Sequence, residues 1–393
     1  YQYTRHPPKT VRPGPNVLVR LCSIECDFTK PLESAANRSF GDDLRGWAAV
    51  ATNLFVWNYV TNFANYMQPH PNMTSLGADI RFFAANKVVG LFEQGDSYNP
   101  AAGDFLQLRT WLLAHLMWRP ESDQSDLTNR FLNGYYGAAG PHLRRYLDLI
   151  NGMGQDPNFR LGCYAADAGF ISDAILAQAD AIFDQAAAAV AADDVLSRRV
   201  RRERLIIDHV HLQRYSFSRR MAELRATLGS DQAAGRAVRA EYREAAQTFC
   251  DLMREEGGTY IREGQVFSSY EPGLLLKCEA AVPPYLPQAG EALPQGAVDI
   301  QQDRFQLFHP GEWVDLVDDP AASDGKAARL PGGHTEWAVQ FHIPEAAPEF
   351  DGGPWRCYFV CRLDAATKAG TALQYGVYPG PINGAGFDLA DDE

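Results

Sequence analysis

The sequence predicts an α/β domain followed by an all-α region and an all-β region, and three apolar runs are the main reason for the first assignment. Each run stops at a polar residue, and these are Glu25, Asn58 and Glu93. Glu25 and Asn58 are 33 residues apart, Asn58 and Glu93 are 35 apart, and a helical pattern fills each gap. Such βα units, with polar residues at the carboxyl ends of the strands, are the repeat of a (β/α)8 TIM barrel. We therefore expect these strands to lie adjacent and parallel, with their carboxyl ends on one face.

Residues 1–119 are predicted to form four strands and three crossover helices. The strands are Tyr1–Thr4, Asn16–Glu25, Leu54–Trp57 and Lys87–Glu93, and the helices are Gly41–Thr52, Ser75–Asn86 and Asp104–Trp118. A complete barrel has eight such units and typically about 250 residues. Half a barrel would leave two unpaired strand edges, which native proteins avoid. We therefore expect residues 1–119 to be the C-terminal half of a TIM barrel and the chain to be a fragment of a longer protein.

Two further regions follow this α/β part. Residues 120–260 show helical periodicity over Asp126–Tyr136, Pro141–Ile150, Ala168–Ala192, Asp193–Leu228 and Asp231–Glu256. Residues 264–393 alternate apolar and polar residues, which predicts strands at Arg304–Phe308, Trp313–Leu316, Trp337–Ile343, Cys357–Leu363 and Leu373–Val377. This pattern is typical of a small antiparallel β-sandwich. The acidic run Asp318–Asp324 could bind calcium or form a plain acidic turn.

Composition excludes several classes of partner. A net charge of −13 argues against nucleic acid, because neutralising phosphates needs a clustered basic surface. No apolar run reaches the roughly 18 residues of a membrane span. Seven cysteines are too few and too scattered for a disulfide scaffold, and Cys22 and Cys26 lack nearby His or Cys partners for zinc. No cofactor is therefore expected, and no metal is expected at the candidate site.

The stretch Leu54–Tyr66 passes from a buried strand into a loop rich in Asn and aromatic residues, which suits a small-molecule pocket. Aromatic rings suit the apolar faces of sugar rings and amides suit their hydroxyls, so the substrate-binding candidates are Trp57, Asn58, Tyr59, Asn62, Tyr66 and Gln94. Glu93 and Glu25 are the candidate catalytic carboxylates, and Glu93 is preferred because Gly95 lets the backbone turn away after it. Core packing of Trp57, and ion pairs of the two glutamates with Arg5 or Arg20, are the structural alternatives.

A family resemblance adds to this interpretation. The runs YQYTRHPPKTVRPGPNVLVRLCSIECDFTKPL, FVWNYVTNFANYMQPHPN, DIRFFAANKVVGLFEQG and FLNGYYGAAGPHLRRYLDL resemble the domain of unknown function 4838, over about residues 1–150. That family is included among the carbohydrate-active enzymes as glycoside hydrolase family 163. The resemblance implies a TIM-barrel endo-β-N-acetylglucosaminidase that cuts complex N-glycans between the two core GlcNAc residues. It also implies a retaining, substrate-assisted mechanism, in which the substrate's 2-acetamido oxygen attacks the anomeric carbon.

The same resemblance bears on location and completeness. In comparable barrels an acid and a polarising carboxylate end strand four, which would precede Tyr1, so we expect the chain alone to be inactive. The intact enzyme is expected to be secreted, periplasmic or on the cell surface, with a glycan as its partner. Two alternatives remain open, namely a non-catalytic carbohydrate-binding or scaffold protein, and a barrel glycosidase for another sugar such as a uronic acid. A uronic acid would need arginines at the strand ends, where the sequence offers Arg5 and Arg20.

Overall fold

The computed structural model describes residues 5–96, 102–281, 305–320, 322, 324–330 and 339–340. The protein is a mixed α/β protein in which helices predominate and the sheets are small. The chain divides into two compact units, residues 1–284 and 285–393. The first unit therefore contains both the predicted barrel part and the predicted helical region.

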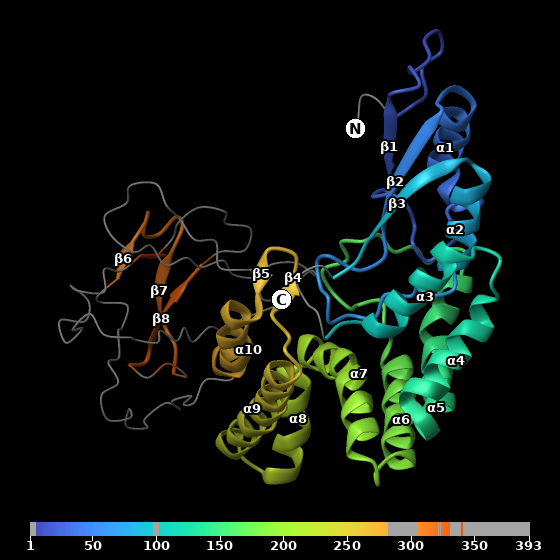
Figure 1. The fold of residues 1–393 in the computed structure, drawn as a ribbon. Helices are drawn as coiled ribbons and strands as arrows, with labels where there is room; N and C mark the ends of the chain where they lie inside the picture. Colours follow the sequence, from blue (N-terminus) through green and yellow to red (C-terminus); the bar gives the residue numbers. More distant parts are fainter. Residues whose placement is uncertain are drawn as a thin grey trace. The chain divides into compact units, whose positions relative to one another are not determined.

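The first unit contains a parallel sheet of three strands (Figure 1). The strands are β1 (Leu18–Cys22), β2 (Asn53–Tyr59) and β3 (Val88–Gln94), and they lie in the order β1-β2-β3. Three helices accompany them, α1 (Arg38–Val50), α2 (Leu76–Ala85) and α3 (Leu106–Trp118), with a 3-10 turn η1 (Ala35–Asn37) before α1. The adjacent, parallel arrangement confirms the prediction for these three strands, whose carboxyl ends meet at one edge. The predicted strand Tyr1–Thr4 lies outside the described residues.

The two faces of this sheet differ. Leu21, Val56 and Leu91 lie side by side on one face, where Val56 is fully buried. Crossovers between parallel strands have one hand, so α1 and α2 cover the same face, as Figure 1 shows. The opposite face carries Leu18 and Phe92, which are 55% and 43% exposed. We call these two sides the covered face and the open face.

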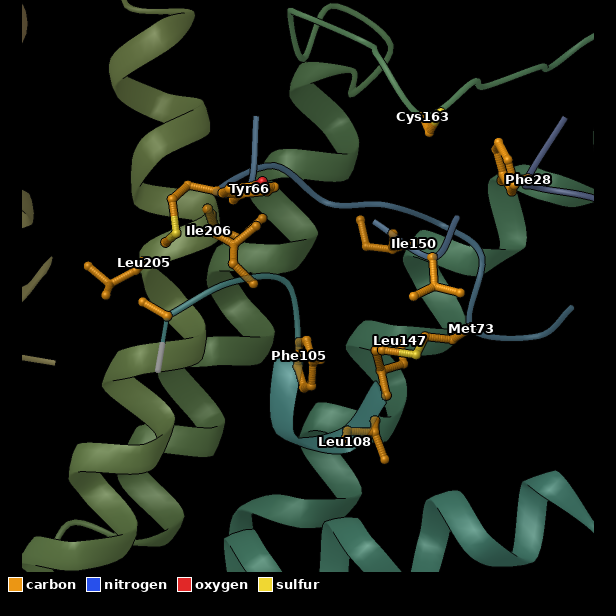
Figure 2. Packing of buried hydrophobic residues seen from close by; sticks show 14 of the residues in the cluster. Phe28, Tyr66, Met73, Phe105, Leu108, Leu147, Ile150, Cys163, Leu205 and Ile206 are labelled. Carbon is orange, nitrogen blue, oxygen red and sulfur yellow. The ribbon is translucent and has the colours of Figure 1, made fainter. Parts of the chain in front are cut away.

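The segment from Val60 to Met73 follows β2 and is buried for almost its whole length. Its backbone groups bond to distant parts of the first unit, since Phe63 N–H donates to the carbonyl of Cys163 and Tyr66 N–H to that of Ile261, both at 2.8 Å. Figure 2 shows residues of this segment beside side chains of the helical region; those labelled are Tyr66, Met73, Leu147, Ile150, Leu205 and Ile206. Buried backbone must find hydrogen-bond partners, so this segment joins the sheet to the helices.

The helical region comprises α4 (Gln124–Tyr136), α5 (Gly140–Gly152), α6 (Asp173–Ala189), α7 (Asp194–Gln213), α8 (Phe217–Leu228) and α9 (Asp231–Glu255), with 3-10 turns η2 (Gly137–Ala139) and η3 (Met153–Gln155). The prediction of one helix over Asp193–Leu228 is wrong, because the chain breaks between α7 and α8. Ser216 is the N-cap of α8, and its hydroxyl accepts a hydrogen bond from the backbone N–H of Arg219. Serine bonds to nearby backbone groups and therefore favours helix starts over helix interiors.

The segment after α9 forms a short hairpin, β4 (Tyr260–Arg262) with β5 (Gln265–Val266), and then α10 (Phe267–Ala281). The sequence pattern assigned this last stretch to the all-β region, and that assignment is wrong for Phe267–Ala281. Leu274 and Cys278 are buried at helical spacing. Pro272 lies inside the helix and obscures the pattern, because proline usually ends helices.

The second unit contains two pairs of short strands. β6 (Gln306–Leu307) pairs antiparallel with β9 (Val339–Gln340), and β7 (Asp315–Asp318) with β8 (Lys326–Arg329). The antiparallel pairing agrees with the predicted strands at Arg304–Phe308, Trp313–Leu316 and Trp337–Ile343 where these are described. The predicted strands Cys357–Leu363 and Leu373–Val377 lie outside the described residues. Asp318 of the acidic run accepts a hydrogen bond from Lys326 Nζ at 2.8 Å.

Candidate functional site

A row of three hydrogen-bonded side chains crosses the carboxyl edge of the parallel sheet. Ser23 Oγ donates to Asn58 Oδ1 at 2.5 Å, and Asn58 Nδ2 donates to Glu93 Oε2 at 2.8 Å. Asn58 and Glu93 are register partners, and both lie on the covered face because they alternate with Trp57 and Phe92. The row therefore ties the ends of all three strands together, and Ser23 is a member that the sequence pattern did not identify.

Glu93 is the unusual member of this row. Its Oε1 is buried and has no hydrogen-bond partner among the described residues. Burial raises the pKa of Glu93 to about 7, although the hydrogen bond from Asn58 opposes that rise. A carboxyl with this pKa gains or loses its proton near neutral pH. On α2, burial likewise raises the pKa of Asp79, and the nearby charge of Glu93 adds to that rise.

Glu25 takes a different position from the one the spacing suggests. It lies three residues beyond the end of β1, with its side chain 51% exposed, and forms an ion pair with Arg5. Arg5 Nε also donates to Asp43 Oδ2 on α1 at 2.6 Å. The structure therefore gives Glu25 the ion-pairing role considered as its alternative and does not place it in the Ser23–Asn58–Glu93 row.

The open face carries an aromatic group centred on Trp57. The indole Nε1 donates to Gln94 Oε1 at 2.5 Å. Tyr59 stacks at a centroid distance of 6.3 Å, and Phe92 meets Trp57 edge-on at 5.2 Å. The guanidinium carbon of Arg20 lies 5.0 Å from the centroid of the same ring. Trp57, Tyr59 and Gln94 thus share one face, while Asn58 and Glu93 occupy the other.

Asn62 and Tyr66 belong to the buried segment after β2. Asn62 Nδ2 donates to the carbonyl of Ala165 at 2.7 Å, and its Oδ1 accepts from the N–H of Ala64 at 3.1 Å. Tyr66 is 1% exposed and meets Phe63 edge-on at 6.4 Å. In this structure both side chains hold the segment against its surroundings in the interior.

A buried charged cluster lies beyond the end of β3. Arg109 Nη2 donates to Asp104 Oδ2 at 2.6 Å, and the N–H of His70 donates to the same oxygen at 3.1 Å. Burial raises the pKa of Asp96 to about 7 and lowers that of His70 to about 3, so the imidazole is neutral. The two ring nitrogens of His70 have no partner among the described residues. The sequence analysis placed Asp104 and Arg109 in the predicted helix Asp104–Trp118 and did not identify this charged cluster.

The described residues were also considered as a source of metal ligands and of membrane-spanning helices, and they provide neither. That part of the chain holds no group of three or more His, Cys, Asp or Glu placed to bind a metal ion. It also holds no helix that is both long and apolar enough to cross a membrane.

Comparison with known proteins identifies the part of the chain that carries these features. Residues 1–148 match the family described as Domain of unknown function (DUF4838). No curated protein and no solved structure matches the chain. The matched range contains the whole parallel sheet, the Ser23–Asn58–Glu93 row and the Trp57 group. These features thus lie in residues 1–148, the part of the chain that matches the DUF4838 family.

Proposed function

We propose that the protein is a glycoside hydrolase resembling an endo-β-N-acetylglucosaminidase that acts on complex N-glycans. The hydrogen bond between Trp57 and Gln94, at the carboxyl ends of parallel strands, carries this proposal. It combines an aromatic surface, which suits a sugar ring, with an amide that can bond to hydroxyls. The position agrees with the general rule that ligands bind at the carboxyl ends of parallel strands.

The fold proposed for the intact enzyme is a TIM barrel in which β1, β2 and β3 are neighbouring strands. Two observations support it, namely the parallel β1-β2-β3 order and the exposed apolar residues of the open face. In a barrel one face of each strand is covered by helices and the other faces the packed interior. The open face would then be the interior face, and Trp57, Tyr59 and Gln94 would lie at the mouth.

The proposed reaction is retaining and substrate-assisted. The 2-acetamido oxygen attacks the anomeric carbon while an acid protonates the departing glycosidic oxygen, and a carboxylate polarises the acetamido N–H. In this scheme Trp57, Tyr59 and Gln94 bind and orient the sugar. The acid and polarising roles are assigned to no residue of this chain, since Glu25 is paired with Arg5 and Glu93 lies on the covered face. A secreted, periplasmic or cell-surface location forms part of this proposal, because complex N-glycans are found on secreted and surface proteins.

A second candidate is a carbohydrate-binding protein without catalysis. The ion pair between Glu25 and Arg5 favours this second candidate, because Glu25 is then engaged and is not free to act as a catalytic carboxylate. The remaining side chains of the site, such as Trp57 and Gln94, can bind a sugar but cannot act as its acid or base. The two candidates differ in one measurable property, which is cleavage of the glycan after it has bound.

The test uses the protein made from its complete gene and a peptide carrying one complex N-glycan. Mass spectrometry should detect a peptide that keeps a single GlcNAc, and a thiazoline analogue of GlcNAc should inhibit the cleavage. Trp57→Phe keeps a ring but removes the N–H that bonds Gln94, so the Gln94 amide loses the contact that orients it and the KM should rise while the protein stays folded.

The matched control is Trp111→Phe, which changes a half-buried tryptophan on α3 that contacts His115 and Phe131. This control should keep the original KM. Glycan binding without cleavage would favour the binding protein, and an intact peptide together with no glycan binding would overturn both candidates.

A further inference from the structure

We propose that Arg20 and Gln94 form a subsite on the open face for the carboxylate of an acidic sugar unit. That the ligand is a sugar rests on the proposed function. The preference for an acidic sugar is inferred from the contacts of Arg20 and Gln94. The subsite would make the protein prefer a sugar that carries a carboxylate over a neutral sugar, a preference that binding of a hexosamine does not require.

Arg20 is the first half of the subsite. It lies on β1, its side chain is exposed, and its guanidinium carbon lies over the indole of Trp57 at 5.0 Å from the ring centroid. Among the described residues the structure gives this guanidinium no hydrogen bond and no ion pair. A guanidinium that lies over an aromatic ring keeps N–H groups that can form a two-point bond to a carboxylate.

Gln94 is the second half, and its orientation follows from its partner. The indole N–H of Trp57 can only donate, so the atom of Gln94 that faces it must be the amide oxygen. The amide nitrogen therefore points away from Trp57 with its N–H groups available. Arg20 and Gln94 thus both carry N–H donors beside one aromatic ring.

The charge pattern of the sheet supports an anionic occupant. Glu93, next to Gln94 in the strand, lies on the covered face and bonds to Asn58. The other arginine considered for an acidic sugar, Arg5, is already paired with Glu25 and Asp43. Arg20 is therefore the arginine near the strand ends whose charge is not balanced by a described carboxylate.

The aromatic surroundings favour a sugar over a simple inorganic anion. Phe92, which is 43% exposed, meets Trp57 edge-on and extends the apolar surface on which a pyranose ring can rest. A planar carboxylate also matches the fork of a guanidinium in a two-point bond. The occupant that satisfies both features is a uronic acid or another carboxylate-bearing pyranose.

The experiment compares two ligands that differ only at the proposed contact. The 393-residue chain is titrated with methyl β-glucuronide and with methyl β-glucoside, and binding is followed by calorimetry and by tryptophan fluorescence. The glucuronide should bind at least about tenfold more tightly, since a charged hydrogen bond is stronger than a neutral one. Arg20→Gln should abolish this preference, and Arg12→Gln, a change at another exposed arginine, should preserve it.

Circular dichroism of each variant confirms that it is folded before it is titrated, and Arg20→Lys provides a second variant that keeps the charge. Equal affinity for both sugars would overturn the proposal, and so would an equal preference in Arg20→Gln. Binding of sulfate or acetate as tight as that of the glucuronide would show a general anion site and would also overturn it. Because binding is measured without turnover, failure of N-glycan cleavage would remove the proposed function and leave this subsite standing.

Discussion

Replacing Arg109 with methionine is expected to destabilise the protein by about 3–5 kcal/mol, because the buried carboxylate of Asp104 then loses its cation. The two side chains are 3% and 7% exposed, and their charged atoms lie 2.6 Å apart. Arg109 also donates to the backbone carbonyl of Asp104 at 2.9 Å and to the side chain of Asn72. Urea unfolding followed by circular dichroism measures the change in the free energy of unfolding.

The matched control is Arg144→Met, which breaks an ion pair of similar geometry at the surface. Arg144 Nε lies 2.9 Å from Asp148 Oδ1, but the side chains are 32% and 59% exposed, so the expected cost is below about 1 kcal/mol. Adding Asp104→Asn to Arg109→Met should recover part of the loss by removing the unpaired charge. Equal effects of the two arginine substitutions would show that the cluster is hydrated in solution.

The order of the strands was predictable from the sequence for a physical reason. Parallel strands need a crossover helix, the crossover has one hand, and the resulting βα unit has a narrow range of lengths. Spacings of 33 and 35 residues between polar strand ends therefore predicted adjacent parallel strands with their carboxyl ends on one face. In the structure Asn58 and Glu93 are register partners, whereas Glu25 lies beyond the end of β1.

The depth and face of each site residue were harder to predict. β1 ends at Cys22, so Ser23 bonds to Asn58, whereas Glu25 lies two residues further along and reaches Arg5. The apolar run continues through Ile24, and nothing local marks the true end of the strand. An offset of one residue moves a side chain to the other face of a sheet, so strand ends must be located to the residue before a site can be assembled.

The buried segment after β2 illustrates a second limit. An Asn-rich stretch normally indicates a surface loop, because its polar groups need water or another partner. Here the partner of Asn62 is the carbonyl of Ala165, more than 100 residues away in the sequence. Such a long-range partner leaves no local signal, so the same residues that suggest a sugar pocket can equally serve the interior.

Replacing Glu93 with glutamine is expected to stabilise the protein above neutral pH and to have little effect on stability at pH 5. The folded pKa of about 7 exceeds the ordinary value of 4.5, so between these values the folded protein holds a proton that the unfolded chain has released. The stability that Glu93 contributes is therefore fully present below about pH 4.5 and is lost as the pH rises through 7. At about 1.4 kcal/mol for each pH unit, the glutamine variant should gain up to about 3 kcal/mol at pH 8.

The Glu93→Gln variant also distinguishes a structural role of Glu93 from a catalytic one. Glutamine preserves an acceptor for Asn58 Nδ2, so the Ser23–Asn58–Glu93 row should persist. If Glu93 only ties the strands together, turnover of the N-glycopeptide should follow the folded fraction, with an unchanged pH profile. If the carboxyl exchanges a proton with substrate, kcat should fall by about a hundredfold or more while the protein stays folded, and the limb of the pH–rate profile near pH 7 should disappear.

The control is Glu121→Gln, a change at an exposed glutamate, which should alter neither stability nor kcat. A Glu93→Gln protein that is less stable than the original at pH 8 would contradict the burial of a titrating carboxyl at this edge of the sheet.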